Sequence, residues 1–336
     1  MEEEPLLRVE NLKKYFNVKN DKHKKAVLKA VDGISMDIGA GETVGLVGES
    51  GCGKSTFGRA VLQLHSITSG KVYFRGKDIT GWSDKDLRPI RKDMQIIFQD
   101  PFASLNPRKT IFETVMAPLD AFDIGTKEER QKKVREMLEF VGLPEYQFHK
   151  MPHEMSGGQR QRAVIARAMI TDPAFIVCDE PVSALDVSVR AQVLNLMKDA
   201  QKATGVAYLF ISHDMSVIRY LCDKVAVMYL GRLVEYGTKE EIFGNPLHPY
   251  TKALLSAIPV PDVGAAKPER IRLVGDVPSP LYPPSGCRLH NRCPYATEEC
   301  SEEGVAQMVR INDNHMTACP FTDDFENRLI DINRPA

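Results

Sequence analysis

The 336-residue sequence has no uninterrupted apolar run of the ~18–20 residues that a membrane-spanning helix needs. Its formal net charge is only -1, so it lacks an overall basic field that would attract nucleic acid. The first residues, Met-Glu-Glu-Glu-Pro, lack the basic and apolar segments of a signal peptide. These absences predict a protein that stays in the cytoplasm, does not act on nucleic acid and reaches a membrane only through a partner.

Cysteine is scarce over most of the chain, where Cys52, Cys178 and Cys222 occur singly. We expect Cys52 and Cys178 to be small packing residues. Four more cysteines gather near the C-terminal end: Cys287, Cys293, Cys300 and Cys319. In a reducing compartment, a local group of four cysteines more often binds a metal than forms disulfides.

Strands alternate with helices along much of the chain, a pattern typical of an α/β fold with a largely parallel sheet. The apolar runs predict strands at residues 43–47, 94–98, 175–178, 206–212 and 225–230. Helical periodicity predicts helices at residues 54–64, 187–202 and 215–221. Residues 6–9 and 31–38 predict strands of a β-rich N-terminal part.

Strand signals stop between about residue 101 and residue 154, where residues 111–122 and 127–141 show helical periodicity. This pattern predicts a helical insertion into the sheet domain. The composition becomes proline-rich after Gly244, which predicts a domain boundary near residue 245.

Residues 48–55 match the phosphate-loop pattern G-x-x-x-x-G-K-[ST] and stand between a predicted strand and a predicted helix. Glycines in this pattern let backbone N–H groups surround a phosphate. Lys54 would neutralise phosphate oxygens, and Ser55 would offer its hydroxyl to Mg²⁺. The predicted nucleotide site contains Gly48, Glu49, Ser50, Gly51, Cys52, Gly53, Lys54, Ser55 and Thr56.

The apolar run at residues 175–178 ends in two carboxylates, Asp179 and Glu180. A strand end would place both near the phosphate loop, so we expect Asp179 to hold Mg²⁺ through water. Glu180 is then placed to polarise the attacking water as a general base. Gln99 and His213 also follow predicted strands; Gln99 could touch Mg²⁺ or water, and His213 the γ-phosphate. Alone, either residue would be an ordinary polar surface residue.

The segment Met155-Ser156-Gly157-Gly158-Gln159 precedes an alanine-rich apolar run. Ser156 stands where a helix N-cap belongs, so free N–H groups and the positive end of the helix dipole would be offered to an anion. A second phosphate-binding element is hard to use on one nucleotide in one small domain. We therefore expect residues 156–159 to act on a nucleotide held by another subunit.

Together these segments resemble the nucleotide-binding subunit of an ATP-binding cassette (ABC) transporter, in order across residues 6–245. The resemblance identifies Gln99 as the Q-loop glutamine, His213 as the switch histidine and residues 183–186, ending in Asp186, as the D-loop. It makes residues 155–159 the signature, with Met155 in place of the usual leucine. It also implies that Phe16, or Tyr15, stacks on adenine. Packing of Phe16 in the core is the alternative.

The implied fold is the P-loop NTPase fold of an ABC nucleotide-binding domain. It comprises a RecA-like core, an antiparallel β subdomain and an α-helical subdomain at about residues 101–170. Residues 246–336 would form a small cysteine-rich extension.

Four segments narrow the resemblance to dipeptide and oligopeptide importers: residues 98–108, 180–190, 245–251 and 283–287. The resemblance implies an ATP-hydrolysing subunit of the F-type that pairs with a homologous D-type ATPase. Its other implied partners are two transmembrane permease subunits and an extracytoplasmic peptide-binding protein. The chain would then lie peripherally on the cytoplasmic face of the membrane. Related importers carry nickel or glutathione, and a soluble ABC ATPase and a nucleotide kinase are further alternatives.

The tail spacing is Cys287-x5-Cys293-x6-Cys300-x18-Cys319. These gaps are wider than those of typical structural zinc sites and match no common ferredoxin spacing. Four thiolates suit a [4Fe–4S] cluster or Zn²⁺ equally, and His290 or His315 could replace a thiolate at zinc. Resemblance to the importer subfamily, whose members carry an iron–sulfur cluster on such a tail, favours [4Fe–4S]. Zn²⁺ and free thiols or a disulfide are the alternatives.

Overall fold

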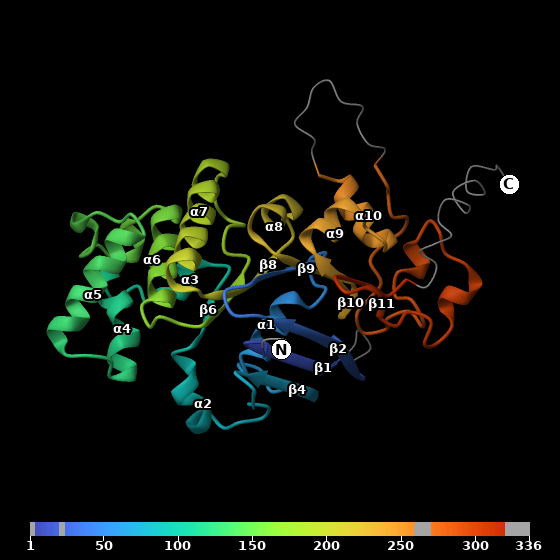
Figure 1. Ribbon diagram of the computed structural model, residues 1–336, viewed down its shortest axis with the longest axis horizontal. Helices are drawn as coiled ribbons and strands as arrows, with labels where there is room; N and C mark the ends of the chain where they lie inside the picture. The colour runs from blue at the N-terminus through green and yellow to red at the C-terminus, as the bar shows by residue number, and fades with distance from the viewer. Residues whose placement is uncertain (1–3, 20–23, 259–269, 320–336) are drawn as a thin grey trace, which may run out of the picture.

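The computed structural model describes residues 4–19, 24–258 and 270–319, which form two β-sheets with α1 between them and most other helices along the larger sheet (Figure 1). The smaller sheet is antiparallel, with strand order β2-β1-β4-β5. Its strands are β1 (Leu7–Lys19), β2 (Lys25–Ile38), β4 (Ser69–Phe74) and β5 (Lys77–Asp78). Strands β1 and β2 extend well beyond the predicted residues 6–9 and 31–38. The register shifts in β1 interrupt the alternation of buried and exposed residues, so the sequence pattern shows only part of each strand.

The larger sheet has the strand order β11-β12-β10-β9-β3-β8-β7-β6. Its parallel part consists of β9 (Lys224–Tyr229), β3 (Thr43–Val47), β8 (Ala207–Ser212), β7 (Phe175–Asp179) and β6 (Met94–Ile97). Every residue of β3, β7 and β8 is buried, because parallel strands are covered on both faces. These strands confirm the predicted α/β fold with a parallel core.

The opposite edge of this sheet is antiparallel and includes strands from the C-terminal part of the chain. Strand β10 (Arg232–Thr238) pairs with β12 (His315–Thr317), which in turn pairs with β11 (Val309–Asn312). The C-terminal extension therefore adds strands to the central sheet. A domain boundary near residue 245 stays a prediction, and residues 259–269 and 320–336 of the predicted extension lie outside the described residues.

The helices next to the parallel strands follow the predicted pattern closely. They are α1 (Lys54–Val61), α7 (Val187–Thr204) and α8 (Met215–Leu221). The helices α9 (Lys239–Gly244) and α10 (Pro249–Ser256), further along the chain, were not predicted. Helix α1 contacts strands of both sheets. It ends earlier than predicted, because Gln63 has a φ of +53°, a left-handed conformation that terminates a helix.

The predicted helical insertion forms one end of the molecule (Figure 1). It contains α3 (Pro101–Ser104), α4 (Ile111–Phe122), α5 (Lys127–Phe140), η1 (Glu145–Gln147), η2 (Pro152–Glu154) and α6 (Gly157–Met169). Thr110 and Thr126 form capping boxes at the starts of α4 and α5, which fixes where these helices begin. Helix α2 (Asp84–Arg91) was not predicted, because Leu87 is its only buried residue and no apolar stripe marks it.

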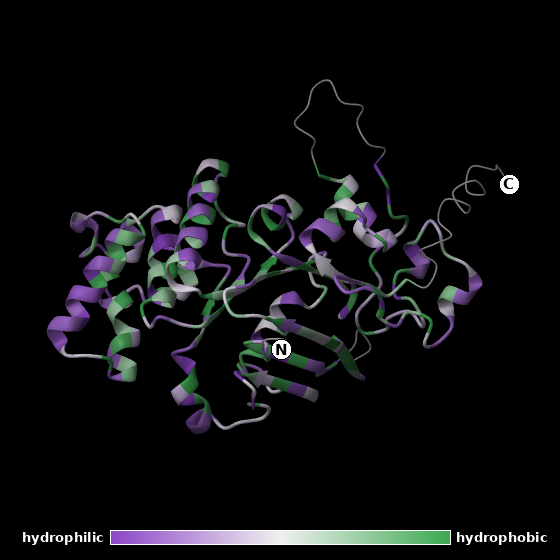
Figure 2. Ribbon diagram, in the orientation of Figure 1, coloured by the Kyte–Doolittle hydropathy of each residue, from purple (hydrophilic) through white to green (hydrophobic). Residues whose placement is uncertain are grey.

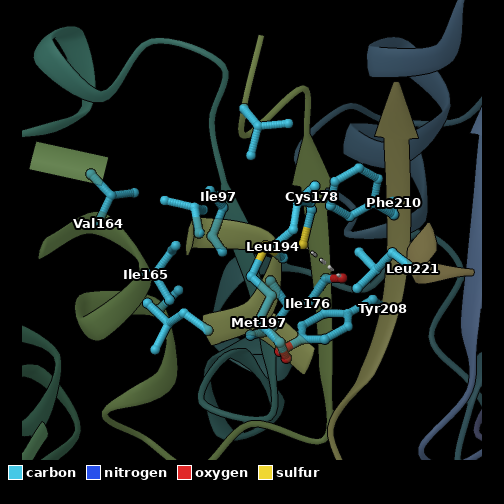
Figure 3. Packing of buried hydrophobic residues seen from close by; sticks show 14 of the residues in the cluster. Ile97, Val164, Ile165, Ile176, Cys178, Leu194, Met197, Tyr208, Phe210 and Leu221 are labelled. Atoms are coloured by element: carbon cyan, nitrogen blue, oxygen red, sulfur yellow. Dashed lines mark hydrogen bonds between the residues drawn. The ribbon is translucent and has the colours of Figure 1, made fainter. Parts of the chain in front are cut away.

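Hydrophobic residues concentrate in the central strands and on the inward faces of the helices, whereas α5 is mostly hydrophilic (Figure 2). Figure 3 shows Ile176 and Cys178 of β7 with Tyr208 and Phe210 of β8, packed with side chains from α6 and α7. Cys52 and Cys178 are both buried, as predicted for packing residues. Within the described residues, no helix is both long enough and apolar enough to cross a membrane.

Candidate nucleotide site

The phosphate loop joins the end of β3 to the start of α1, as its sequence predicts. Its glycines are required by backbone geometry: Gly48 has a φ of +154° and Gly53 a φ of +108°. A Cβ atom on Gly48 would lie 2.1 Å from the Met228 carbonyl oxygen, and one on Gly53 would lie 2.0 Å from the Ala30 carbonyl oxygen. Only glycine fits both the conformation and the space.

Lys54 is buried and folds back over the loop. Its ammonium group donates to the carbonyl oxygens of Gly48 at 2.8 Å and Glu49 at 3.0 Å. The neighbouring Ser55 hydroxyl donates to the Asp179 carboxylate at 2.6 Å. Burial raises the pKa of Asp179, which is only 1% exposed, against the opposing effect of the Ser55 hydrogen bond. A hydroxyl and a carboxylate side by side are oxygen ligands of the kind that Mg²⁺ takes together with phosphates.

Glu180 stands at the end of β7 with two predicted site residues beside it. Its carboxylate accepts a hydrogen bond from the Gln99 amide at 3.1 Å, and it lies 3.4 Å from Nδ1 of His213. The Glu180 backbone has a φ of +48°, a costly conformation for a residue with a side chain. The structure therefore brings together the three side chains predicted to be catalytic, from the ends of three strands.

An open cleft of about 580 Å³ connects these groups. It is lined by residues 50–56 of the phosphate loop, by Gln99, Glu180 and His213, and by Phe16. Phe16 is outside the hydrophobic core, and the ring of His65 meets its ring edge-on with centroids 5.9 Å apart. Tyr15 instead donates its hydroxyl to Asp32. This geometry favours Phe16 over Tyr15 as the aromatic of the cleft.

The signature segment lies outside this cleft. Ser156 is the N-cap of α6 and forms a capping box with Gln159, in which the Ser156 N–H donates to the Gln159 side chain at 3.0 Å. Ser156 and Gly157 are exposed, whereas Met155 is buried as the leucine it replaces would be. Asp186 stands at the N-cap position of α7, without a side-chain capping hydrogen bond, and is also exposed. These residues do not line the cleft of their own chain.

Several residues of the site were missed by sequence reasoning. The cleft wall includes Leu230 and Gly231 from the turn after β9, and Pro280 from the C-terminal extension. Arg59 of α1 lies 3.6 Å from Asp179. None of them belongs to a motif; only Arg59, one helical turn beyond Ser55, carried a positional signal that could have placed it near the phosphates.

The four tail cysteines lie near one another, as expected. Cys287, Cys293, Cys300 and Cys319 line one small cavity together with His248 and His290. Burial raises the pKa of the Cys287 thiol and raises that of Cys293 to about 12. Across residues 4–19, 24–258 and 270–319, no group of three or more His, Cys, Asp or Glu side chains is arranged to hold a metal ion. The arrangement of the described residues therefore does not support the expected zinc or iron–sulfur site.

His315 does not join the cysteines, which corrects its suggested role as a zinc ligand. Its Nε2 lies 2.7 Å from the Glu235 carboxylate and its Nδ1 lies 3.4 Å from that of Glu241. His315 is buried, and both of its ring nitrogens face carboxylates and not thiols.

Residues 31–183 match the family model of ABC transporters, and residues 234–300 match the oligopeptide/dipeptide transporter C-terminal region. The chain is 49% identical to the oligopeptide transport ATP-binding protein AppF of Bacillus subtilis (strain 168), covering 94% of this chain and 97% of that protein. It is 48% identical to the oligopeptide transport ATP-binding protein OppF of Salmonella typhimurium, covering 95% and 96%.

Among solved structures, the chain is similar to the ATP-binding cassette MJ0796, a dimer in a post-hydrolysis state bound to ADP and Pi. The TM-score is 0.63 at 29% identity, covering 69% of this chain and 98% of that one. The fold, the phosphate loop and these likenesses define an ABC-type ATPase. More narrowly, the chain belongs to the ATP-binding proteins of oligopeptide and dipeptide ABC transporters, which confirms the family that the sequence resembles.

Proposed function

We propose that this chain hydrolyses ATP to drive the import of dipeptides or oligopeptides, from the cytoplasmic face of the cell membrane. The observation that carries the proposal is the position of Glu180 between Gln99 and His213, beside the phosphate loop. Full-length similarity to peptide-import ATP-binding proteins supports the transport role.

In this proposal, backbone N–H groups of residues 48–56 and the Lys54 ammonium bind the ATP phosphates. Ser55, Asp179 and Gln99 would hold Mg²⁺, which supplies charge neutralisation at the phosphate oxygens. Phe16 stacks on the adenine ring.

Glu180 accepts a proton from the attacking water, and His213 orients that water against the γ-phosphate. The hydrogen bond from Gln99 to Glu180 links the proposed base to the start of the helical insertion.

We assign residues 156–159 and Asp186 to the ATP held by a second ATPase subunit. Two observations support this assignment: none of these residues lines the cleft of its own chain, and Ser156, Gly157, Asp186 and the adjacent Val187 (80%) are exposed. The F-type resemblance makes that partner a homologous D-type ATPase. A dimer would leave Val187 covered and would place one α6 N-terminus against each nucleotide.

The remaining partners are two transmembrane permease subunits and an extracytoplasmic peptide-binding protein. The helical insertion is the proposed contact to the permeases. Phe102, at its start, is 52% exposed, and the Arg160 guanidinium lies 5.0 Å from its ring. We propose that this exposed aromatic side chain is part of the contact.

Replacement of Glu180 by Gln tests the catalytic assignment. The variant should bind ATP, hydrolyse it at least about 100-fold more slowly and accumulate as a closed dimer with its partner. Normal hydrolysis by this variant would refute the role of Glu180 as the base. Uptake by the reconstituted transporter, with dipeptides, oligopeptides, nickel and glutathione compared, tests the solute.

We further propose that the four tail cysteines hold a [4Fe–4S] cluster with a structural role. The presence of all four cysteines in the lining of one cavity supports the proposal, together with the subfamily resemblance. Anaerobically purified protein should show an absorbance band near ~400 nm and bound iron. Bound zinc in a colourless protein would instead support the zinc alternative. If the protein contains neither iron nor zinc, the four cysteines are free thiols.

A further inference from the structure

The C-terminal extension contacts the phosphate loop through Arg292, which pairs with Glu49 of the loop. The Arg292 guanidinium donates to both oxygens of the Glu49 carboxylate, at 3.0 and 3.3 Å, and to the Tyr229 hydroxyl at 3.2 Å. The Arg292 side chain is 10% exposed and that of Glu49 is 28% exposed. A shielded pair held through two oxygens is more strongly fixed than a surface ion pair.

Glu49 is the second residue of the phosphate loop, and its backbone makes three further contacts. Its N–H donates to the Tyr250 hydroxyl at 2.8 Å. Its carbonyl oxygen accepts from the Lys54 ammonium at 3.0 Å and from the Cys52 N–H at 3.3 Å. A displacement of Glu49 would therefore move two groups that face the ATP phosphates, Lys54 and the backbone of Cys52.

The backbone of Arg292 is itself firmly placed. Arg292 ends the short helix η3 (His290–Arg292), which lies between Cys287 and Cys293, and both cysteines line the cysteine cavity. The Cys287 N–H donates to the Cys300 carbonyl oxygen at 2.8 Å. The guanidinium thus extends from a fixed turn toward the phosphate loop.

A second arginine of the same segment, Arg288, is linked to the phosphate loop through the turn after β9. Arg288 donates to the Leu230 carbonyl oxygen and to the Asp32 carboxylate. The adjacent Gly231 N–H donates to the Cys52 carbonyl oxygen at 2.9 Å. Two side chains of one short segment are therefore linked to the loop, Arg292 directly through Glu49 and Arg288 through the turn that contains Leu230 and Gly231.

We infer that Arg292 is a positioning residue of the ATP site: through Glu49 it holds the phosphate loop in the conformation that receives the ATP phosphates. The inference rests on the proposed ATPase function. Arg292 does not line the nucleotide cleft, so it acts through Glu49 and not on ATP itself.

The test measures the dissociation constant of ATP with Mg²⁺ on the full-length chain, and kcat and KM on that chain together with its partner ATPase subunit. Arg292→Gln and Glu49→Gln should each weaken ATP binding about tenfold, and the double variant no more than either single one, because both remove the same link. For Arg292→Gln, the value of kcat at saturating ATP should stay within about twofold of the wild-type value. Arg292→Lys keeps the charge but loses the contact with both carboxylate oxygens. Its ATP affinity should lie between those of the wild type and of Arg292→Gln.

Arg310→Gln is the matched control, since Arg310 is an exposed arginine of the same extension, paired with Asp313 at 3.8 Å. It should leave ATP binding unchanged. Three results would overturn the inference. They are a wild-type ATP affinity in Glu49→Gln, a loss of ATP affinity in the double variant equal to the product of the two single losses, or a decrease in kcat with no change in ATP affinity. If Arg292→Gln does not fold, Glu49→Gln decides alone. A wild-type chain that binds no ATP would instead refute the proposed function.

Discussion

Replacing Asp32 with Asn should destabilise the protein strongly, because Asp32 joins the N-terminal sheet to the C-terminal extension. Its carboxylate accepts from the Tyr15 hydroxyl and pairs with Arg288, and with Arg232 at 3.0 Å. The side chains of Asp32 and Arg288 are each 5% exposed. Burial by itself raises the pKa of Asp32, but the Tyr15 hydrogen bond and the two guanidinium groups bring it below its ordinary value.

The size of the effect follows from which charge is left without a partner. Arg232 is 45% exposed and can turn to water, whereas Arg288 stays buried without its counter-charge. Removing one partner of a buried pair costs about 3–5 kcal/mol, and we expect about 3 kcal/mol here. Asp37→Asn on the same strand is the control. Its pair with Arg8, at 3.6 Å, is about half exposed, so the loss should stay below about 1 kcal/mol.

The assay is the free energy of unfolding in urea at neutral pH. The Asp32 contribution is complete above the ordinary carboxyl pKa of 3.8 and is lost as the pH falls through the lower folded-state value. Adding Arg288→Met to Asp32→Asn removes the unpaired charge and should recover most of the lost stability. A loss for Asp32→Asn no larger than that of Asp37→Asn, or no recovery in the double variant, would refute the reasoning.

Three further predictions concern the nucleotide site. Gly53→Ala should abolish ATP binding, because its Cβ would lie 2.0 Å from the Ala30 carbonyl oxygen. The Cβ of Gly51→Ala meets nothing within 4 Å, so this variant should lose only about 1 kcal/mol of folding stability, because of its φ of +78°. Ser156→Arg should leave ATP binding by its own chain intact but block ATP hydrolysis with the partner, as a mixed-subunit assay would show. EDTA should abolish ATP hydrolysis by the wild-type chain, and added Mg²⁺ should restore it.

The success of the strand and helix predictions depended on local signals. Residues 43–47 and 207–212 were recognisable because buried parallel strands are continuously apolar, and the start of α6 because Ser156 and two glycines mark a helix N-terminus. Strands β11 and β12 were missed, because β11 is entirely exposed and both are very short. Their position in the sheet is decided by the pairing of β12 with β10 and of β11 with β12, which no local pattern encodes.

The sequence by itself determined the chemistry that short backbone segments carry: the phosphate loop, the carboxylates after β7 and the signature at the start of α6. Each of these motifs consists of residues adjacent in the sequence, so its chemical role can be recognised without knowledge of the fold. Only the tertiary structure decided that Glu180 meets Gln99 and His213, and that arginines of the extension reach Asp32 and Glu49. Those contacts join residues up to 256 positions apart, and in a sequence a charged residue that will be buried is indistinguishable from one that will be solvated.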